Sequence, residues 1–137
     1  MIFRSPLALA AALGAAPLLL TVQLVTATAA HADGDPTKGK QIFNKCMVCH
    51  SIQAGVNKIG PSLHGVVGRK AGTVDGYNYT DAMKNSGFTW DEATLNKYLT
   101  NPRKAVPGTR MVFVGLPKEP DRLDVIAYLK QAGGTAP

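Results

Sequence analysis

The sequence is poor in cysteine and, after its first 32 residues, poor in apolar residues. It contains 2 Cys, and although hydrophobic residues make up 45% of the chain, 22 of them fall in residues 1–32. The rest of the chain is then about 38% hydrophobic, which is a low share for a domain that must bury a core. A chain of 137 residues with this distribution excludes a two-domain protein and a multi-span membrane protein. No internal repeat or low-complexity run follows residue 32.

The apolar residues at the start have the order of an export signal. Arg4 is the only charged residue before Asp33, an apolar stretch follows it, and small residues end the segment at Ala32. This order predicts a secretory signal peptide over residues 1–32, with cleavage after Ala32. The alternative is an uncleaved membrane anchor, since the stretch carries no charge. In either case we expect the domain of residues 33–137 to lie in the periplasm.

The two cysteines lie in the pentapeptide Cys46-Met47-Val48-Cys49-His50. This is the c-type haem attachment sequence. Two thiols three residues apart on a helical turn can form thioethers with both vinyl groups of one haem, and His50 then lies under the iron as the proximal ligand. A disulfide would leave His50 unexplained, a thioredoxin-like pair needs a βαβ context that the sequence lacks, and zinc lacks further ligands at suitable spacing. We therefore predict one covalent haem c, whose apolar body completes a core that the chain alone would not fill.

Four segments after residue 32 show helical patterns, and two glycine- and proline-rich stretches separate them. The helices are expected from the Asp35-Pro36 cap towards Cys46, around Thr80–Met83, from the Thr89–Glu92 capping box to Asn101-Pro102, and from Glu119 to Gly133. Residues 51–79 and 103–117 are expected to be long loops that lie against a cofactor. The predicted fold class is all-α, with three main helices and one short helix.

Three methionines follow residue 32, and one of them is predicted to be the sixth ligand. Met47 lies on the side of the haem that His50 already occupies, and Met83 is expected to fill the core. Met111 lies in the second loop, and His/Met ligation is usual in c-type haems that carry electrons. The alternative sixth ligand is His64, which we interpret as a structural histidine that bonds the backbone.

These features together resemble the class I cytochromes c, the mitochondrial type and its soluble bacterial relatives, over nearly all of residues 34–133. Gly39 and Phe43 match packing residues of the first helix, and Tyr128 matches the terminal helix that crosses it. The resemblance implies the class I cytochrome c fold, wrapped around the attached haem. One departure is Met83, because the mitochondrial type usually has a polar side chain there that bonds a buried water.

The resemblance also implies roles for residues around the haem. The Pro61 carbonyl would accept a hydrogen bond from the His50 ring and raise its electron donation. Other residues would anchor the haem propionates or lie near the methionine sulfur: Arg69, Tyr79, Trp90, Tyr98 and Thr109. The alternative is that the three aromatic residues are ordinary buried side chains and that Arg69 is a solvated surface cation.

A haem with two protein ligands has no vacant position for a substrate. We therefore predict a soluble periplasmic electron carrier rather than an enzyme, which exchanges one electron at a time by outer-sphere transfer. Two alternatives remain open: a haem enzyme or small-ligand sensor in which Met111 is displaced, and a membrane-anchored carrier that retains its leader.

Acidic residues are scarce as well, with 9 Asp and Glu against 15 Lys and Arg. Basic residues near the expected haem edge predict a docking surface for acidic redox partners, such as a quinol-cytochrome c reductase, a terminal oxidase or a photosynthetic reaction centre. The predicted docking residues are Lys45, Lys58, Arg103, Lys104, Arg110, Phe113 and Lys118. The alternative is a scattered positive surface. We expect a monomer and no nucleic-acid partner, because the domain is exported and has no binding motif.

Overall fold

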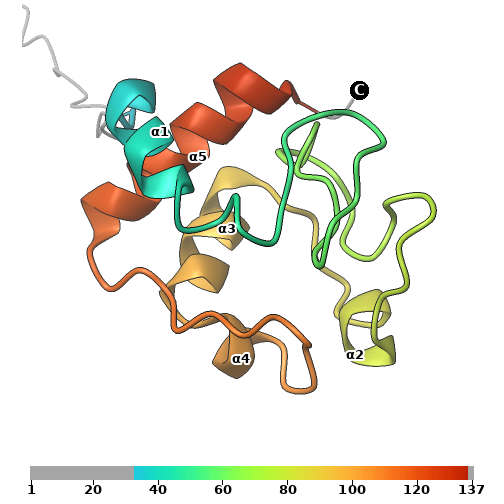
Figure 1. Cartoon of the computed structure of the whole chain (residues 1–137). Helices are drawn as coiled ribbons and strands as arrows, with labels where there is room; N and C mark the ends of the chain where they lie inside the picture. The colour runs from blue at the N-terminus through green and yellow to red at the C-terminus, as the bar shows by residue number, and fades with distance from the viewer. Residues whose placement is uncertain (1–32, 136–137) are drawn as a thin grey trace, which may run out of the picture.

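The computed structural model describes residues 33–135, so the predicted signal peptide lies outside the described residues. Residues 33–135 form five helices: α1 (Pro36–Phe43), α2 (Asp81–Lys84), α3 (Glu92–Thr100), α4 (Pro102–Ala105) and α5 (Glu119–Gly133) (Figure 1). The same residues form no β-strand, only two isolated bridges. The all-α prediction is therefore confirmed. None of the described helices is long and apolar enough to span a bilayer.

Helix α1 begins where its cap predicts. The Asp35 carboxylate accepts hydrogen bonds from the backbone N–H groups of Thr37, at 2.8 Å, and Lys38, at 3.3 Å. These bonds lower the pKa of Asp35 because they stabilise its ionised form. Pro36 occupies the first helical position, where its missing N–H costs no hydrogen bond. The first helix thus starts as expected and ends at Phe43, three residues before Cys46.

Helices α1 and α5 cross closely, and they lie against one another in Figure 1. Gly39 permits the crossing, because a Cβ at this position would overlap the backbone carbonyl of Asp124 on α5. Beside the crossing point, the rings of Phe43 and Tyr128 pack with centroids 5.2 Å apart. The crossing brings the start of the described chain onto its last helix, since the Asp35 N–H donates to the Asp124 carboxylate at 2.7 Å.

Two features around α3 differ from the sequence predictions. The cap of α3 is Asp91, whose carboxylate accepts from the Thr94 N–H at 2.7 Å, rather than Thr89. A further short helix, α4, begins directly after α3, where a loop was predicted. The reason is Asn101: it ends α3, and its side-chain oxygen then accepts from the Lys104 N–H at 3.0 Å and so caps α4.

The core lies where α3, α5 and the connecting loops meet. Its most deeply buried members include Leu95 and Leu99 of α3, Val125 and Ile126 of α5, and Leu116 from the segment between α4 and α5. We call that segment, residues 106–118, the strap. In Figure 1 the strap runs along the bottom of the molecule, and the long loop that follows α1 occupies the upper right. The two predicted haem ligands thus come from two separate irregular segments.

Candidate haem site

The pentapeptide with the two cysteines forms one tight turn. The backbone carbonyl of Cys46 accepts from the N–H of Cys49 at 3.0 Å and from the N–H of His50 at 2.9 Å. Both cysteines are free and half-buried. Burial raises the pKa of the Cys46 thiol to about 11, although the charge of Lys45 opposes the shift. Thioether attachment needs two unpaired thiols three residues apart in one turn, and this turn supplies them.

The ring of His50 is held on two sides by residues of the same loop. Its Nδ1 lies 2.8 Å from the Pro61 carbonyl oxygen, which leaves Nε2 available for a metal. Gly60 lies against the ring so closely that a Cβ at this position would overlap it. Burial lowers the pKa of His50, more than the bond to Pro61 raises it, and so favours the neutral imidazole that can ligate iron.

Lys58 closes the same turn from outside. Its ammonium group donates to the carbonyl oxygens of Met47, at 2.5 Å, and His50, at 3.4 Å. Lys58 is itself exposed, so its assignment to the docking surface stays a prediction, and these bonds add a contact with the backbone of the attachment turn. The other predicted basic docking residues are exposed as well: Lys45, Arg103, Lys104, Arg110 and Lys118. Of these, Arg110 also donates a hydrogen bond to the Asn78 carbonyl.

Met111 lies half-buried on the strap, and its sulfur accepts a hydrogen bond. The donor is the hydroxyl of Tyr98 on α3, 3.3 Å from the sulfur. Thr109 orders the backbone next to it, because its hydroxyl accepts from the Met111 N–H at 3.2 Å. Burial raises the pKa of Tyr98, so the phenol stays protonated and able to donate at neutral pH. A thioether sulfur has two lone pairs, and the second remains free to bind a metal.

The residues implied to anchor propionates are linked through Arg69. Arg69 and Tyr79 affect each other's pKa and are both half-buried, and burial lowers the pKa of the first and raises that of the second. The Arg69 guanidinium donates to the Ser62 carbonyl at 3.0 Å, so it also closes the loop on itself. Trp90 is buried with its ring 4.8 Å from that of Tyr98. The Trp90 backbone N–H also donates to the Arg69 carbonyl at 2.8 Å, so Trp90 lies between the Arg69 segment and Tyr98, the donor to Met111.

Sequence reasoning misassigned His64 and overlooked its neighbour Ser62. The His64 side chain is exposed, so the interpretation as a backbone-bonding histidine is not supported. The Ser62 hydroxyl does this work instead: it is buried, donates to the Gln53 carbonyl at 2.7 Å and accepts from the His64 N–H at 3.2 Å. A serine directly after Gly60-Pro61 gave no pattern that would distinguish it from the other loop residues.

Arg122 is a second residue that the sequence analysis missed. It is buried on α5, and its guanidinium donates to the carbonyl oxygens of Leu116, at 2.8 Å, and Pro117, at 2.9 Å, at the end of the strap. A signal was present, because Arg122 precedes Val125, Ile126 and Leu129 by three, four and seven residues and so shares their apolar face.

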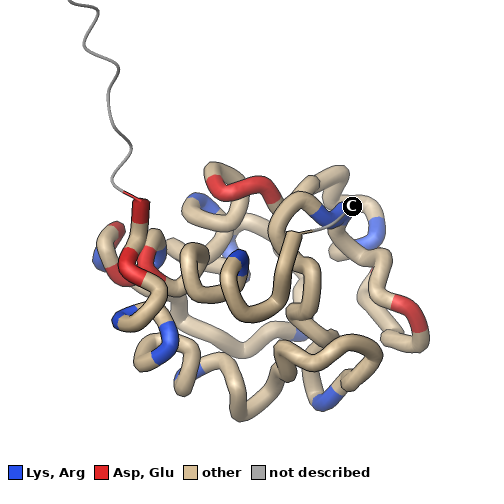
Figure 2. Tube along the Cα trace, turned by 90° about the horizontal axis from the view of Figure 1, so that it is seen from above, with Lys and Arg blue, Asp and Glu red and all other residues tan. Residues whose placement is uncertain are grey.

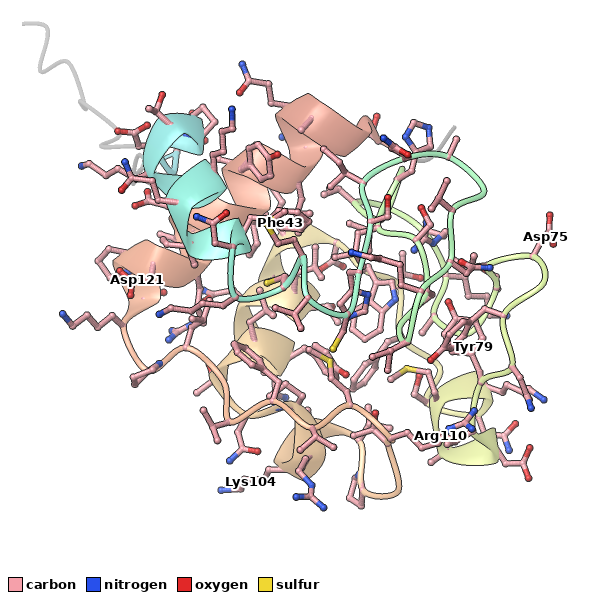
Figure 3. The ribbon with its side chains drawn as sticks, in the orientation of Figure 1. Phe43, Asp75, Tyr79, Lys104, Arg110 and Asp121 are labelled. Carbon is pink, nitrogen blue, oxygen red and sulfur yellow. The ribbon has the colours of Figure 1, made fainter. Side chains whose placement is uncertain are left out.

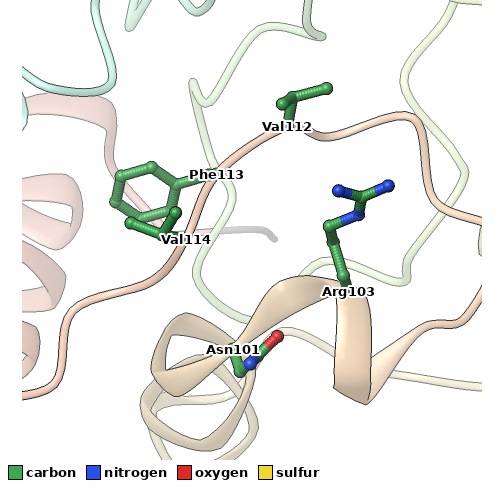
Figure 4. Close-up of a pocket in the computed structure, with 5 residues that line it drawn as sticks. All are labelled: Asn101, Arg103, Val112, Phe113 and Val114. Carbon is green, nitrogen blue, oxygen red and sulfur yellow. The ribbon is translucent and has the colours of Figure 1, made fainter.

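The strap also borders a hollow of about 370 Å³ (Figure 4). Its lining residues are Asn101, Arg103, Val112, Phe113 and Val114. The valines are 88% and 89% exposed, whereas Phe113 between them is half-buried. Figure 3 shows Lys104 and Arg110 at the lower edge of the molecule, on the same side as the strap. Apolar and basic side chains therefore share this edge.

The residues present fit a covalently attached haem. Two free thiols, an imidazole whose Nδ1 is already bonded, and a thioether sulfur with a fixed donor make a complete donor set for attachment and for two axial ligands. Gly60 keeps space beside the imidazole. No buried polar side-chain atom in residues 33–135 lacks a partner, so this donor set is held without a polar group left unsatisfied.

Known proteins share both the sequence and the fold. Residues 36–133 match the family model for cytochrome c. The chain is 55% identical over 112 residues to cytochrome c2 of Rhodomicrobium vannielii, covering 81% of this chain and 90% of that protein. It is 57% identical over 99 residues to cytochrome c2 of Rhodoblastus acidophilus, covering 72% and 92%. Among solved structures, cytochrome cH from Methylobacterium extorquens matches with a TM-score of 0.68 and 48% identity, covering 72% of this chain and 99% of that one.

The matched region includes all five helices and the attachment turn. Cys46 and Cys49 have the spacing with which the family holds haem c covalently, so the cofactor prediction is confirmed. The resemblance seen in the sequence is confirmed in the same way, at identities of about half over most of both chains. The chain belongs to the class I cytochromes c, a family of electron carriers with covalently bound haem c.

Proposed function

We propose that this chain is a periplasmic carrier whose haem iron is ligated by His50 and Met111. The observation that carries the proposal is the hydrogen bond from the Tyr98 hydroxyl to the Met111 sulfur, at 3.3 Å. A buried phenol that donates to a thioether fixes the direction of the remaining lone pair, which a methionine that merely fills a core does not need. His64, the alternative ligand, is exposed.

Each ligand has a partner that sets its chemistry. The bond between Nδ1 of His50 and the Pro61 carbonyl holds the proton on that nitrogen and makes Nε2 a stronger electron donor. The bound haem supplies a centre that gains and loses one electron, and ligation by sulfur favours its reduced form. With His50 and Met111 both holding the iron, no position would remain for a substrate, so electron exchange would be outer-sphere.

The proposal includes export of the domain. Residues 1–32 have the order of a signal peptide, and cleavage after Ala32 would release a chain that starts at Asp33. A mass spectrum of the purified protein tests this step. A mass that matches a chain starting at Asp33 supports cleavage and a carrier free of the membrane. A mass that includes residues 1–32 supports the membrane-anchored alternative.

The strap edge is the proposed docking surface for an acidic redox protein. Val112 and Val114 supply exposed apolar contacts, and Arg103 lies in the same hollow. Basic residues are spread around the whole trace (Figure 2), so total charge alone does not select a face. What selects the strap edge is that apolar and basic side chains occur there together, as in the core and rim of transient interfaces. Partners of this chemistry include a quinol-cytochrome c reductase, a terminal oxidase or a photosynthetic reaction centre.

The ligation is tested by absorption spectra of matched methionine variants. Oxidised protein should show the weak band at the red end of the visible range that reports sulfur bound to ferric haem. Met111→Leu should abolish the band and let the reduced protein bind carbon monoxide, whereas Met83→Leu, a change of the same type in the core, should leave both unchanged. Carbon monoxide binding by the unmodified protein would instead support the small-ligand alternative.

Docking is tested by the ionic-strength dependence of electron transfer to an acidic partner. The second-order rate should fall steeply as salt rises, and Arg103→Gln should reduce both the rate at low salt and the slope. Lys40→Gln on α1 is the matched control, because Lys40 is exposed on a helix remote from the strap. A flat ionic-strength profile, or equal effects of the two variants, would refute the proposed surface.

A further inference from the structure

Arg122 is a charged side chain in an unusual place. It lies near the start of α5 and is 9% exposed, and only Ser62 joins it as a buried polar or charged side chain in residues 33–135. Burial of a guanidinium is costly unless its N–H groups are bonded. The contacts that offset this cost therefore show what the residue holds in place.

The guanidinium joins three parts of the fold. Its Nη1 donates to the carbonyl oxygens of Leu116, at 2.8 Å, and Pro117, at 2.9 Å, and its Nε donates to the side-chain oxygen of Asn96 on α3, at 2.6 Å. All three acceptors are uncharged. The Asn96 amide in turn donates to Glu119 at 3.0 Å, which fixes the orientation of its oxygen. Arg122 thus ties the end of the strap to α3 and α5 together.

Other contacts also hold this end of the strap against α3. The Leu116 N–H donates to the Leu99 carbonyl of α3 at 2.8 Å, and Leu116 itself is 2% exposed. Gly115 lies so close to the Thr100 carbonyl that a Cβ would overlap it. Between this anchored end and Met111, in contrast, Val112 and Val114 lie almost wholly in water.

The other end of the strap has its own attachment. The Arg110 guanidinium donates to the Asn78 carbonyl, and Gly108 lies against Ala82 of α2. Met111 is therefore carried by a segment that is fixed at both ends. Between the ends only Met111 and Phe113 pack against the core, so how far the sulfur can move depends largely on how firmly the two ends hold.

We propose that Arg122 is a positioning residue for Met111, which limits how readily the strap lifts and so how readily the sulfur leaves the iron. The inference rests on the proposed ligation by Met111. Arg122 touches neither the sulfur nor the haem-binding cysteines in these contacts, so it acts through the Leu116 and Pro117 carbonyls. A lysine would keep the charge but not the planar fork that reaches three acceptors at once.

The test measures how well exogenous imidazole displaces Met111 from the ferric holoprotein. Arg122→Gln should raise the apparent imidazole affinity about tenfold to a hundredfold. The reason is that lifting the strap costs less free energy when fewer charged hydrogen bonds must break. Arg122→Lys should lie between this variant and the unmodified protein. Hydrogen exchange of the Leu116 amide should accelerate in the same order.

The matched control is Val125→Ala. Val125 lies one turn further along α5 and is 1% exposed, so its truncation lowers global stability without removing a bond to the strap. It should leave the imidazole affinity within about twofold. If Arg122→Gln does not yield holoprotein, Asn96→Ala removes one of the three acceptors and should raise the affinity by about two- to fivefold.

The outcomes separate this inference from the proposed function. An oxidised protein without the sulfur–iron band would refute ligation by Met111, and the inference with it. A normal band, together with equal effects of Arg122→Gln and Val125→Ala, or no effect of either, would refute only the positioning role. Arg122 would then be an ordinary stabilising residue of α5.

Discussion

The two proposed ligands are held in different ways. The His50 ring lies between the Pro61 carbonyl and Gly60, and its backbone belongs to the turn that carries both cysteines. These contacts come from residues at most eleven positions away. Met111 is held by Tyr98 of α3, and the ends of the strap are held by Asn78 and Leu99, which lie 32 and 17 positions from their partners Arg110 and Leu116.

This difference indicates which ligand is able to move. A side chain that is packed and bonded by its own loop cannot be displaced without disrupting that loop. A side chain that is held by one hydrogen bond, on a segment anchored mainly at its ends, can leave by local opening, at a cost set by that bond and the anchors. Ligand exchange should therefore start on the Met111 side, while the His50 side keeps the haem in place.

The largest effect is expected from Gly60→Ala on the His50 side. The new methyl group would overlap the imidazole, and the bond from its Nδ1 to the Pro61 carbonyl opposes a shift of the ring. We expect the free energy of unfolding of the holoprotein to fall by about 3 kcal/mol, measured by guanidinium denaturation. Gly55→Ala is the control: its φ is +69° but no atom lies within 4 Å, so only backbone strain of about 1 kcal/mol is added. Equal losses would contradict the close packing of His50.

A smaller effect is expected from Gly115→Ala on the strap. At a φ of +100°, the methyl group would overlap the Thr100 carbonyl, and relief of this overlap would displace the strap rather than the loop of His50. We expect a stability loss of about 2 kcal/mol, together with a weakened sulfur–iron band. Gly87→Ala, at a φ of +72° with open space around it, should keep the band at full strength. An intact band in Gly115→Ala would show that the strap end and Met111 move independently.

The smallest effect is expected from Tyr98→Phe, which removes the donor to the Met111 sulfur. One lost hydrogen bond corresponds to about 1 kcal/mol, or about a fivefold increase in imidazole affinity for the ferric protein. Tyr77→Phe removes a comparable bond on the other side, to the Ile59 carbonyl at 2.8 Å, and should leave imidazole binding unchanged. If both variants bind imidazole equally well, the two sides do not differ as described.

Sequence reasoning succeeded where the determinants are local. The attachment turn, the Asp35 cap and the end of α5 at Gly133 each depend on residues within a few positions, so their patterns are visible in the sequence. The same holds for Pro61, which lies in the loop of His50 and contacts its ring.

Prediction from the sequence failed where one residue has two structural roles or lies in an uncommon environment. Asn101 ends one helix and caps the next, so the Asn-Pro pair was taken only as a stop, and α4 was missed. Arg122 was overlooked because arginine is seldom buried, and its partners are revealed only when the strap folds back on α5. The bond from Lys58 to the Met47 carbonyl was also not foreseen, because it depends on how the loop folds back on the attachment turn.

The two bare valines of the strap have a consequence for the protein in isolation. Val112 and Val114 place apolar surface in water at the edge where cations also lie, and like charges on separate copies keep such surfaces apart in dilute salt. Added salt screens that repulsion and leaves the apolar contact intact. We expect the protein to stay dispersed in concentrated solution at low ionic strength and to self-associate as the ionic strength rises. The conditions that weaken docking to a partner would then favour association between copies of this chain.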